Sequence, residues 1–179
     1  MVPAYEKREG GEEIMRLGIC LLVVAGWVSG QDRAVPLFTI EKSSNANRVQ
    51  YEARVLPDGH IDPHQPVVAY WIMAAENGRR QELNILERAK AYGFTLHQDG
   101  IDSYKLWVVS HREKEIHVYR EGATVRAEAV IGGRVALVEK IFIQMHKSFL
   151  LSFPDFGEMF GFDRETGEKR YEKVLRTEQ

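Results

Sequence analysis

The side chains best suited to chemistry lie close together in the loop GHIDPHQP. His60, Asp62 and His64 place two imidazoles and a carboxylate within five residues, and both zinc and copper accept imidazole ligands. An extended loop would bring alternate side chains to one side, but a catalytic metal site needs at least three well-placed protein ligands. The alternative is a plain polar turn. We therefore predict no cofactor, with zinc or copper at these three residues as the alternative.

A second group of polar side chains occupies the segment KSSNAN. The hydroxyl of Ser43 and the amides of Asn45 and Asn47 are suited to binding a carboxylate or a glycan, and loops positioned by a rigid sheet commonly carry function. The same side chains can instead hydrogen-bond locally and shape a hairpin. Both interpretations stay open.

Three aromatic residues, Tyr70, Trp71 and Trp107, fall on predicted strands. Aromatic rings that line a cavity can bind an apolar ligand or a sugar ring. Rings of this size more often belong to the core, because they bury the most area per residue. Adjacent strand residues point to opposite faces, so only one of Tyr70 and Trp71 can line a given cavity.

Motifs for several reaction classes are missing. The sequence has no Gly-x-Ser-x-Gly elbow and no glycine-rich strand-to-helix loop for phosphate. The formal net charge is −2 without a long basic run, which argues against nucleic acid as a partner. A catalytic pair of carboxylates cannot be recognised in one sequence, so a hydrolase is not excluded.

The elements that must position these residues are mostly strands. Residues 48–56 alternate between apolar and polar side chains, which is typical of a half-buried strand. Gly132-Gly133 between two β-branched runs predicts a tight hairpin. Residues 82–92 show the period of an amphipathic helix, with Gly93 as its C-terminal cap. We predict a mainly β domain over residues 36–175, an antiparallel barrel or sandwich of about eight strands with one α-helix at residues 82–92.

The N-terminal region has the order of a secretion signal. Leu17–Val28 is apolar, Arg16 precedes it and small residues follow it. The run is shorter than the roughly 20 residues that span a membrane, so we predict a signal peptide at 15–30, cleaved after Gly30 or alternatively after Ala34, and no transmembrane anchor after cleavage. A buried N-terminal helix is the alternative. Residues 1–14 are interpreted as an over-extended start or a disordered tail.

Several segments together resemble a known family. They are LFTIEKSSNANRVQYEARV, PVVAYWI, ERAKAYGF, VIGGRVALVEKIFI and GFDRETGEKRYEKV. The sequence resembles an uncharacterised family of secreted bacterial proteins that is known as a domain of unknown function. The resemblance implies export and a single β-rich domain. It implies no activity, cofactor or catalytic residue.

The predicted function follows from export, near-neutral charge and the lack of a catalytic motif. We expect a periplasmic or extracellular, non-catalytic binding or interaction domain, whose partner is a small molecule, a glycan or an envelope protein. The alternatives are a hydrolase that acts on envelope or extracellular polymers and a structural component of the envelope.

Overall fold

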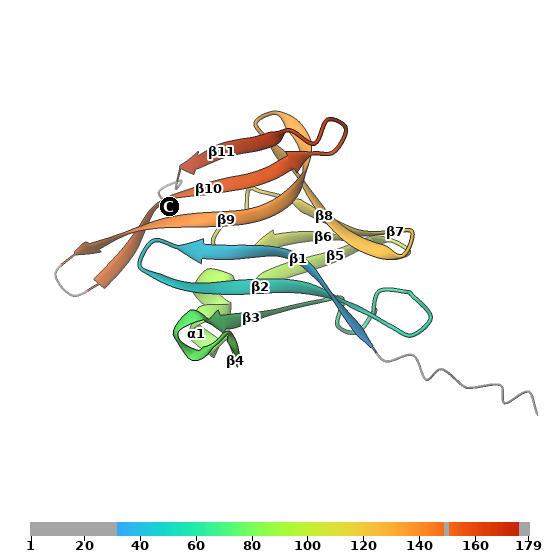
Figure 1. Ribbon diagram of the computed structural model, residues 1–179, viewed down its shortest axis with the longest axis horizontal. Coiled ribbons are helices and arrows are strands. Elements are labelled where there is room, and N and C mark those ends of the chain that lie inside the picture. The colour runs from blue at the N-terminus through green and yellow to red at the C-terminus, as the bar shows by residue number, and fades with distance from the viewer. Residues whose placement is uncertain (1–31, 149–150, 176–179) are drawn as a thin grey trace, which may run out of the picture.

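The protein is mainly β, as predicted, and its strands form one curled sheet. The computed structural model describes residues 32–148 and 151–175, so the predictions for residues 1–14 and 15–30 lie outside the described residues. The sheet has the strand order β4-β3-β2-β1-β9-β8-β7-β6-β5, and β10 and β11 extend from β9. It curls into a half-barrel (Figure 1). The described strands are β1 (Arg33–Lys42), β2 (Asn45–Val55), β3 (Val67–Met73), β4 (Arg79–Glu82), β5 (Phe94–Gly100), β6 (Ser103–Val108), β7 (Ile116–Glu121), β8 (Thr124–Ile131), β9 (Arg134–Ser148), β10 (Leu151–Asp163) and β11 (Lys169–Leu175).

The core lies on the concave side of the half-barrel. Alternation in β2 places Val49, Tyr51, Ala53 and Val55 in this core, each at most 3% exposed. Phe38 of β1 stacks on Tyr51 with ring centroids 4.5 Å apart. The alternation read in the sequence is therefore the one that buries β2 on the core side.

β9 is the junction of the sheet. It pairs with β8 near its start and with β10 along most of its length, both antiparallel. Its middle, Lys140–Ile143, pairs in parallel with Thr39–Lys42 of β1. The sheet is thus mixed and has eleven strands, whereas an antiparallel sheet of about eight was expected. The difference arises because no local pattern reports a parallel pairing between segments so far apart in the chain.

Strands β5 to β9 follow one another as antiparallel neighbours. Gly132 and Gly133 connect β8 to β9 with φ angles of 58° and 80°. A type I′ turn requires positive φ at both central residues, so the predicted hairpin is confirmed.

The helix begins later than predicted and ends at Tyr92, as predicted, but without the predicted cap. Residues 79–82 form β4, and the helix consists of α1 (Ile85–Glu87) continued by the π-helical turn η2 (Arg88–Tyr92). Asn84 caps its start. Gly93 has extended backbone, φ −66°, and is not the left-handed cap expected. A Cβ there would lie 1.9 Å from the carbonyl oxygen of Arg88, so glycine is needed for close approach.

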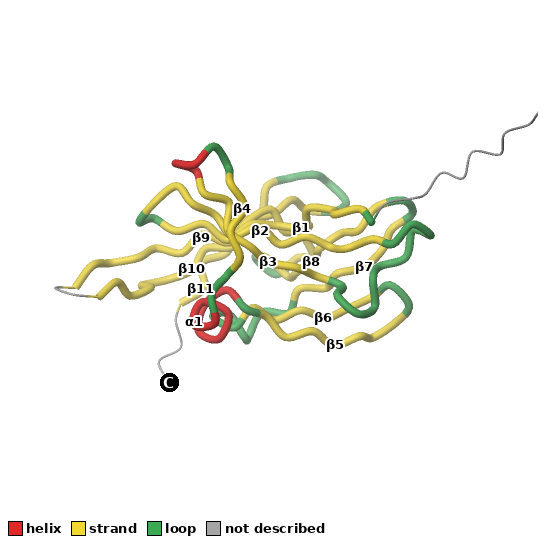
Figure 2. Tube along the Cα trace, turned by 90° about the horizontal axis from the view of Figure 1, so that it is seen from below, coloured by secondary structure: helices red, strands yellow, loops and turns green. Residues whose placement is uncertain are grey.

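The curl separates the sheet into two arms, one formed by β1 to β4 and the other by β5 to β8. In Figure 2, β1 and β2 lie on one side of the molecule and β5 and β6 lie on the other, with α1 on the same side as β5 and β6. The 3₁₀ turn η1 (Ala74–Glu76) connects β3 to β4. Within the described part of the chain, no helix has the length and apolar character needed to cross a membrane.

Candidate functional site

Two of the predicted metal ligands, His60 and Asp62, have other side-chain hydrogen bonds in the structure. His60 Nδ1 lies 2.8 Å from Asp102 Oδ2, while Asp62 Oδ1 accepts a 2.9 Å hydrogen bond from the backbone N–H of His64. Among residues 32–148 and 151–175, no three His, Cys, Asp or Glu side chains are grouped so that they could hold a metal ion. The zinc or copper site remains a sequence prediction that this geometry does not support.

Asp102 fastens the histidine loop to the sheet. Its carboxylate accepts hydrogen bonds from Arg120 Nε at 2.6 Å, His60 Nδ1 at 2.8 Å and the Ile61 backbone N–H at 2.8 Å. Burial by itself raises the pKa of Asp102, but the three hydrogen bonds outweigh it and hold this pKa below its ordinary value. This loop is therefore fixed by the β5–β6 turn.

The polar turn between β1 and β2 uses its side chains internally. Ser43 Oγ accepts a 2.9 Å hydrogen bond from the N–H of Met145. Asn45 Oδ1 accepts from the N–H of Asn47, and Asn47 Oδ1 accepts from the N–H of Ala74 at 3.0 Å. The bond between Asn45 and Asn47 is of the local kind that the sequence left open, whereas the other two connect the turn to β9 and to the end of β3.

The three aromatic candidates do not share a cavity. Trp71 is 5% exposed in the core and meets Tyr92 edge-on with ring centroids 4.9 Å apart. Tyr70 points to the opposite face, where Arg80 covers its ring at 3.7 Å. Trp107 is half-buried on β6, in the other arm of the sheet.

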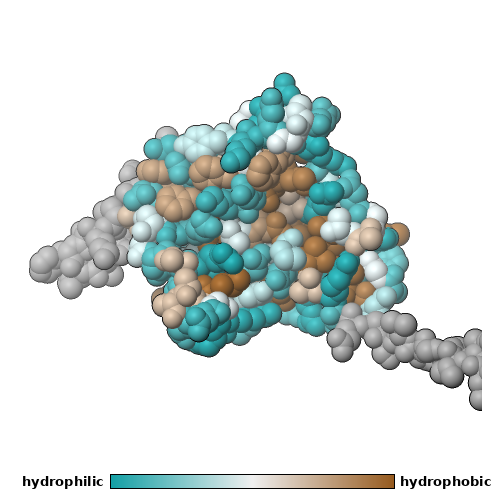
Figure 3. All heavy atoms as spheres, viewed as in Figure 1, coloured by the Kyte–Doolittle hydropathy of each residue, from teal (hydrophilic) through white to brown (hydrophobic). Residues whose placement is uncertain are grey.

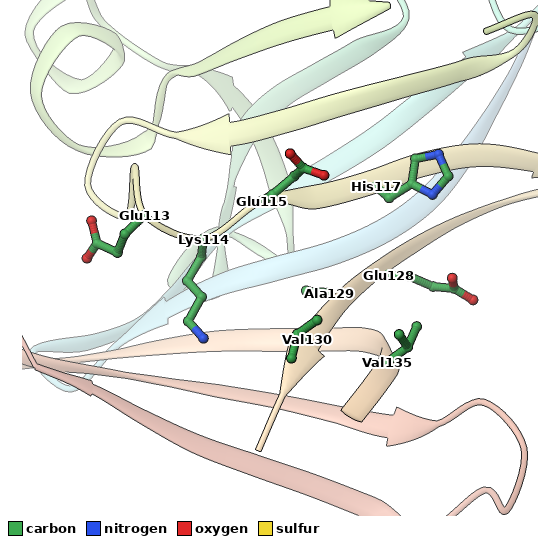
Figure 4. A pocket seen from close by; sticks show the side chains of 8 residues that line it. All are labelled: Glu113, Lys114, Glu115, His117, Glu128, Ala129, Val130 and Val135. Atoms are coloured by element: carbon green, nitrogen blue, oxygen red, sulfur yellow. The ribbon is translucent and has the colours of Figure 1, made fainter. Parts of the chain in front are cut away.

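A pocket that the sequence did not reveal opens between β7 and β8. The two strands pair only as far as His117 and Glu128, and beyond this point the loop before β7 diverges from the β8–β9 hairpin. The space between them, here called the wedge, has a volume of about 400 Å³. Figure 4 shows the eight residues that line it: Glu113, Lys114, Glu115, His117, Glu128, Ala129, Val130 and Val135.

The wedge combines an apolar floor with an acidic rim. Val130 and Val135, which are cross-strand partners, are 53% and 52% exposed. The lining also has three carboxylates and one ammonium. That ammonium, Lys114 Nζ, is held 2.5 Å from Glu172 Oε1, and Glu172 Oε2 accepts a hydrogen bond from the N–H of Gly132. This bridge fixes the loop against the hairpin and fixes the width of the wedge.

Glu128 is the most buried carboxylate of the wedge, with the residue 7% exposed. Its Oε1 accepts a 2.5 Å hydrogen bond from the Tyr119 hydroxyl and lies 3.1 Å from Arg164 Nη1. Burial and the hydrogen bond to Glu128 raise the pKa of Tyr119, so this hydroxyl stays a donor. Glu128 is thus oriented by a rigid set of neighbours.

His117 connects the wedge to a serine. Its ring stacks on Tyr119 at 4.8 Å, and its Nε2 lies 2.8 Å from Ser103 Oγ. Ser103 Oγ donates a 2.6 Å hydrogen bond to Asp99 Oδ1, and this bond is the main cause that lowers the pKa of Asp99. Because an ionised Asp99 only accepts, the serine proton points to Asp99 and away from His117. Ser103 therefore bridges the two side chains.

Another pocket, of about 510 Å³, lies beside the first half of β3, which pairs with β2 but not with β4. Four arginines are among its lining residues. Arg54 pairs with Asp32, Arg88 with Glu82, and Arg33 donates to the carbonyl oxygen of Ala123. Arg80 lies over the Tyr70 ring. Charged groups in both pockets have partners within the protein, but the wedge also exposes Val130 and Val135, so it is the better candidate for a site.

The sequence could not reveal the wedge because its residues come from separate segments. Glu113–His117, Glu128–Val130 and Val135 become neighbours only through the β7–β8 and β8–β9 registers. The one available signal was Val130 and Val135, two apolar residues on the polar side of an alternating pattern.

Comparison with known proteins gives a family without an activity. No curated protein and no solved structure matches the chain. A family model described as a domain of unknown function, DUF4833, matches residues 38–173. This match runs from within β1 to within β11 and covers more than half of the chain, so the protein belongs to the DUF4833 family.

Proposed function

We propose that the protein is an exported, non-catalytic binding domain whose wedge takes up a small organic cation with an aliphatic body. The observation that carries this proposal is the combination of an exposed Val130–Val135 floor with three carboxylates among the lining residues, one of them the buried Glu128. An aliphatic chain would cover the floor, and its charged end would approach the carboxylates. A volume of about 400 Å³ lies within the range that small-ligand pockets occupy.

A titration tests the ligand class. Pentylammonium, pentanoate and pentanol share the aliphatic chain and differ in charge, so we expect amide shifts around Val130 and Val135 in NMR spectra with pentylammonium alone. Val135→Lys should abolish these shifts by occupying the floor and adding a like charge. Ile101→Lys, at a residue 86% exposed elsewhere, is the matched control. Equal shifts with pentanoate would contradict the proposal.

Hydrolysis of envelope or extracellular polymers is the second candidate, because Ser103 contacts His117 next to the wedge. The bridge to Asp99 favours binding over nucleophilic attack, since the Ser103 proton is directed away from the His117 base. A fluorophosphonate probe distinguishes the two candidates. We expect no labelling, whereas labelling that is lost in Ser103→Ala would favour the hydrolase. A structural role in the envelope is the third candidate.

Export is tested by the N-terminus of the mature protein. The pairing of β1 with β2 begins with the Arg33–Val55 and Ala34–Arg54 pairs. Cleavage after Ala34 would remove Arg33 and Ala34 from this pairing. This supports cleavage after Gly30. We expect the protein in the periplasm or medium, beginning at Gln31 by intact mass. Recovery of the full-length chain from the cytoplasm would contradict export.

A further inference from the structure

The outward side of β9, β10 and β11 carries an unusual share of aromatic rings. In β10, Gly157, Met159 and Gly161 are buried toward the core, so the residues between them point outward. The aromatic face, as we call it, comprises Phe142, Phe156, Phe160, Phe162 and Tyr171. Its four phenylalanines are half of the eight in the chain, although phenylalanine normally belongs to the core.

Strand registers arrange this face in rows. Phe160 lies between Lys140 of β9 and Tyr171 of β11, and Glu158 lies between Phe142 and Lys173. Cross-strand partners share a face. Figure 3 shows brown apolar atoms gathered over these strands among teal polar ones. Tyr171, 51% exposed, is the most accessible ring, and its hydroxyl donates a 2.9 Å hydrogen bond to Glu158.

Lysines accompany the rings. Lys173 Nζ lies 3.6 Å from the centroid of Phe156, and Lys140 Nζ lies 5.4 Å from that of Phe160. On β11, Lys169 and Lys173 are exposed and flank Tyr171 at two residues on either side. The side chains of Lys169, Tyr171 and Lys173 share one face, and the Cα atoms of the two lysines lie about 13 Å apart. A ring with a cation at each side is therefore presented along an edge strand.

We propose that the aromatic face binds an acidic polysaccharide, with sugar rings against Tyr171 and carboxylate groups of the polymer at Lys169 and Lys173. This site is distinct from the wedge and does not depend on its ligand. Polymers of this kind carry anionic groups at intervals and ring faces between them. That is the pattern that β11 complements.

The small number of basic residues on the aromatic face favours a polysaccharide over other anionic partners. Single-stranded nucleic acid has a phosphate at every nucleotide, and its binding grooves are strongly basic. Anionic membrane surfaces are recognised by clusters of about four to eight basic residues. The face combines Lys140, Lys169 and Lys173 with two acids, Glu158 and the Glu41 that pairs with Lys140 at 3.2 Å.

Binding of defined oligomers to the whole secreted domain tests the proposal. The probe is a hyaluronan decasaccharide, in which every second sugar is acidic, and the matched neutral probe is a chitin hexasaccharide. By calorimetry we expect binding of hyaluronan and at least tenfold weaker binding of chitin. Lys169→Gln with Lys173→Gln should weaken hyaluronan binding about fivefold. Tyr171→Ala should weaken it about tenfold. Lys90→Gln, an exposed lysine near the helix end, should leave it unchanged.

Several outcomes would overturn the proposal. They are no binding of hyaluronan at millimolar concentration, equal binding of chitin, or binding that both lysine and tyrosine variants retain. Preferential binding of oligodeoxythymidylate or of phosphatidylserine vesicles would assign the face to another class of partner. If Tyr171→Ala loses its native circular dichroism, the double glutamine variant decides the question, because both lysines are exposed. Failure of pentylammonium to bind the wedge would leave this result untouched.

Discussion

Asp102 shows how much a single buried carboxylate can hold together. It has φ 54°, is 7% exposed and connects β5–β6 to β7 and to the loop after β2. Asp102→Asn keeps the backbone preference, since asparagine also tolerates this conformation, but leaves the Arg120 guanidinium without its anion. We expect a loss of about 3 kcal/mol in the free energy of unfolding, measured by urea denaturation at neutral pH.

The same carboxylate makes stability depend on acid pH. The pKa of Asp102 in the folded protein is lowered, so its contribution is present above the ordinary value of 3.8 and is lost as the pH falls through the lowered pKa. As the pH is lowered below about 3.8, the melting temperature of Asp102→Asn should therefore fall less steeply than that of the wild type. Asp58→Asn, an exposed turn residue, should behave like the wild type. An equally steep fall in the Asp102 variant would contradict this assignment.

Gly157 and His111 form a second close pair. A Cβ at Gly157 would lie 2.3 Å from His111 Nε2, and the imidazole is 7% exposed. Gly157→Ala should cost about 2 kcal/mol by overpacking. Adding His111→Ala should cancel most of this cost, because the methyl group of the alanine at position 157 then meets the space that the imidazole occupied. A double-mutant cycle measured by urea denaturation checks the coupling, and strictly additive losses would contradict it.

Residues with local signals could be predicted, and residues whose partners are distant could not. Gly132-Gly133 and the opposite faces of Tyr70 and Trp71 follow from neighbours in the chain. The partners of His60 and Ser43, by contrast, are Asp102 and Met145. No period or spacing in a single sequence connects such positions, so the sequence alone left a metal site and a binding turn open there.

At the scale of elements, the helix shows what periodicity misses. A 3.6-residue period places Leu86 on the apolar side of the helix, but Leu86 is 69% exposed and Ile85 is 87% exposed. The π-helical turn over Arg88–Tyr92 changes the angle per residue, so a 3.6-residue period assigns the wrong side. β4 was missed altogether because all four residues of Arg79–Glu82 are polar or charged and exposed, which is how proteins protect an edge strand.

The start of the helix depends on one capping box. Asn84 Oδ1 accepts from the N–H of Glu87 at 2.8 Å, and Glu87 Oε2 accepts from the N–H of Asn84 at 2.9 Å. Asn84→Ala should cost about 1 kcal/mol and speed hydrogen exchange at Arg88, whose N–H bonds the Asn84 carbonyl. Asn84→Asp, which also caps, should preserve both values. Unchanged exchange in the alanine variant would refute the role of the cap.

At the scale of the whole molecule, the parallel β1–β9 pair joins segments roughly a hundred residues apart, which predicts folding in milliseconds to seconds. Thr39→Pro lies in β1 between β2 and β9 and should cost about 3 kcal/mol or more. Arg80→Pro on the edge strand β4 should cost less. Circular dichroism melts of both variants provide the comparison, and a reversed order would show that β1 is not central to stability.

The parallel pair also sets the response of the domain to mechanical force. β1 and β9 run in the same direction, β10 runs opposite and β11 runs with β1 (Figure 1). Tension applied between residue 33 and residue 175 would pull β1 and β11 lengthwise in opposite senses. The three ladders between them would then bear load in shear, where many hydrogen bonds must break together, and not by unzipping one bond at a time. A domain anchored at both ends should therefore resist stretching better than its stability at rest would suggest.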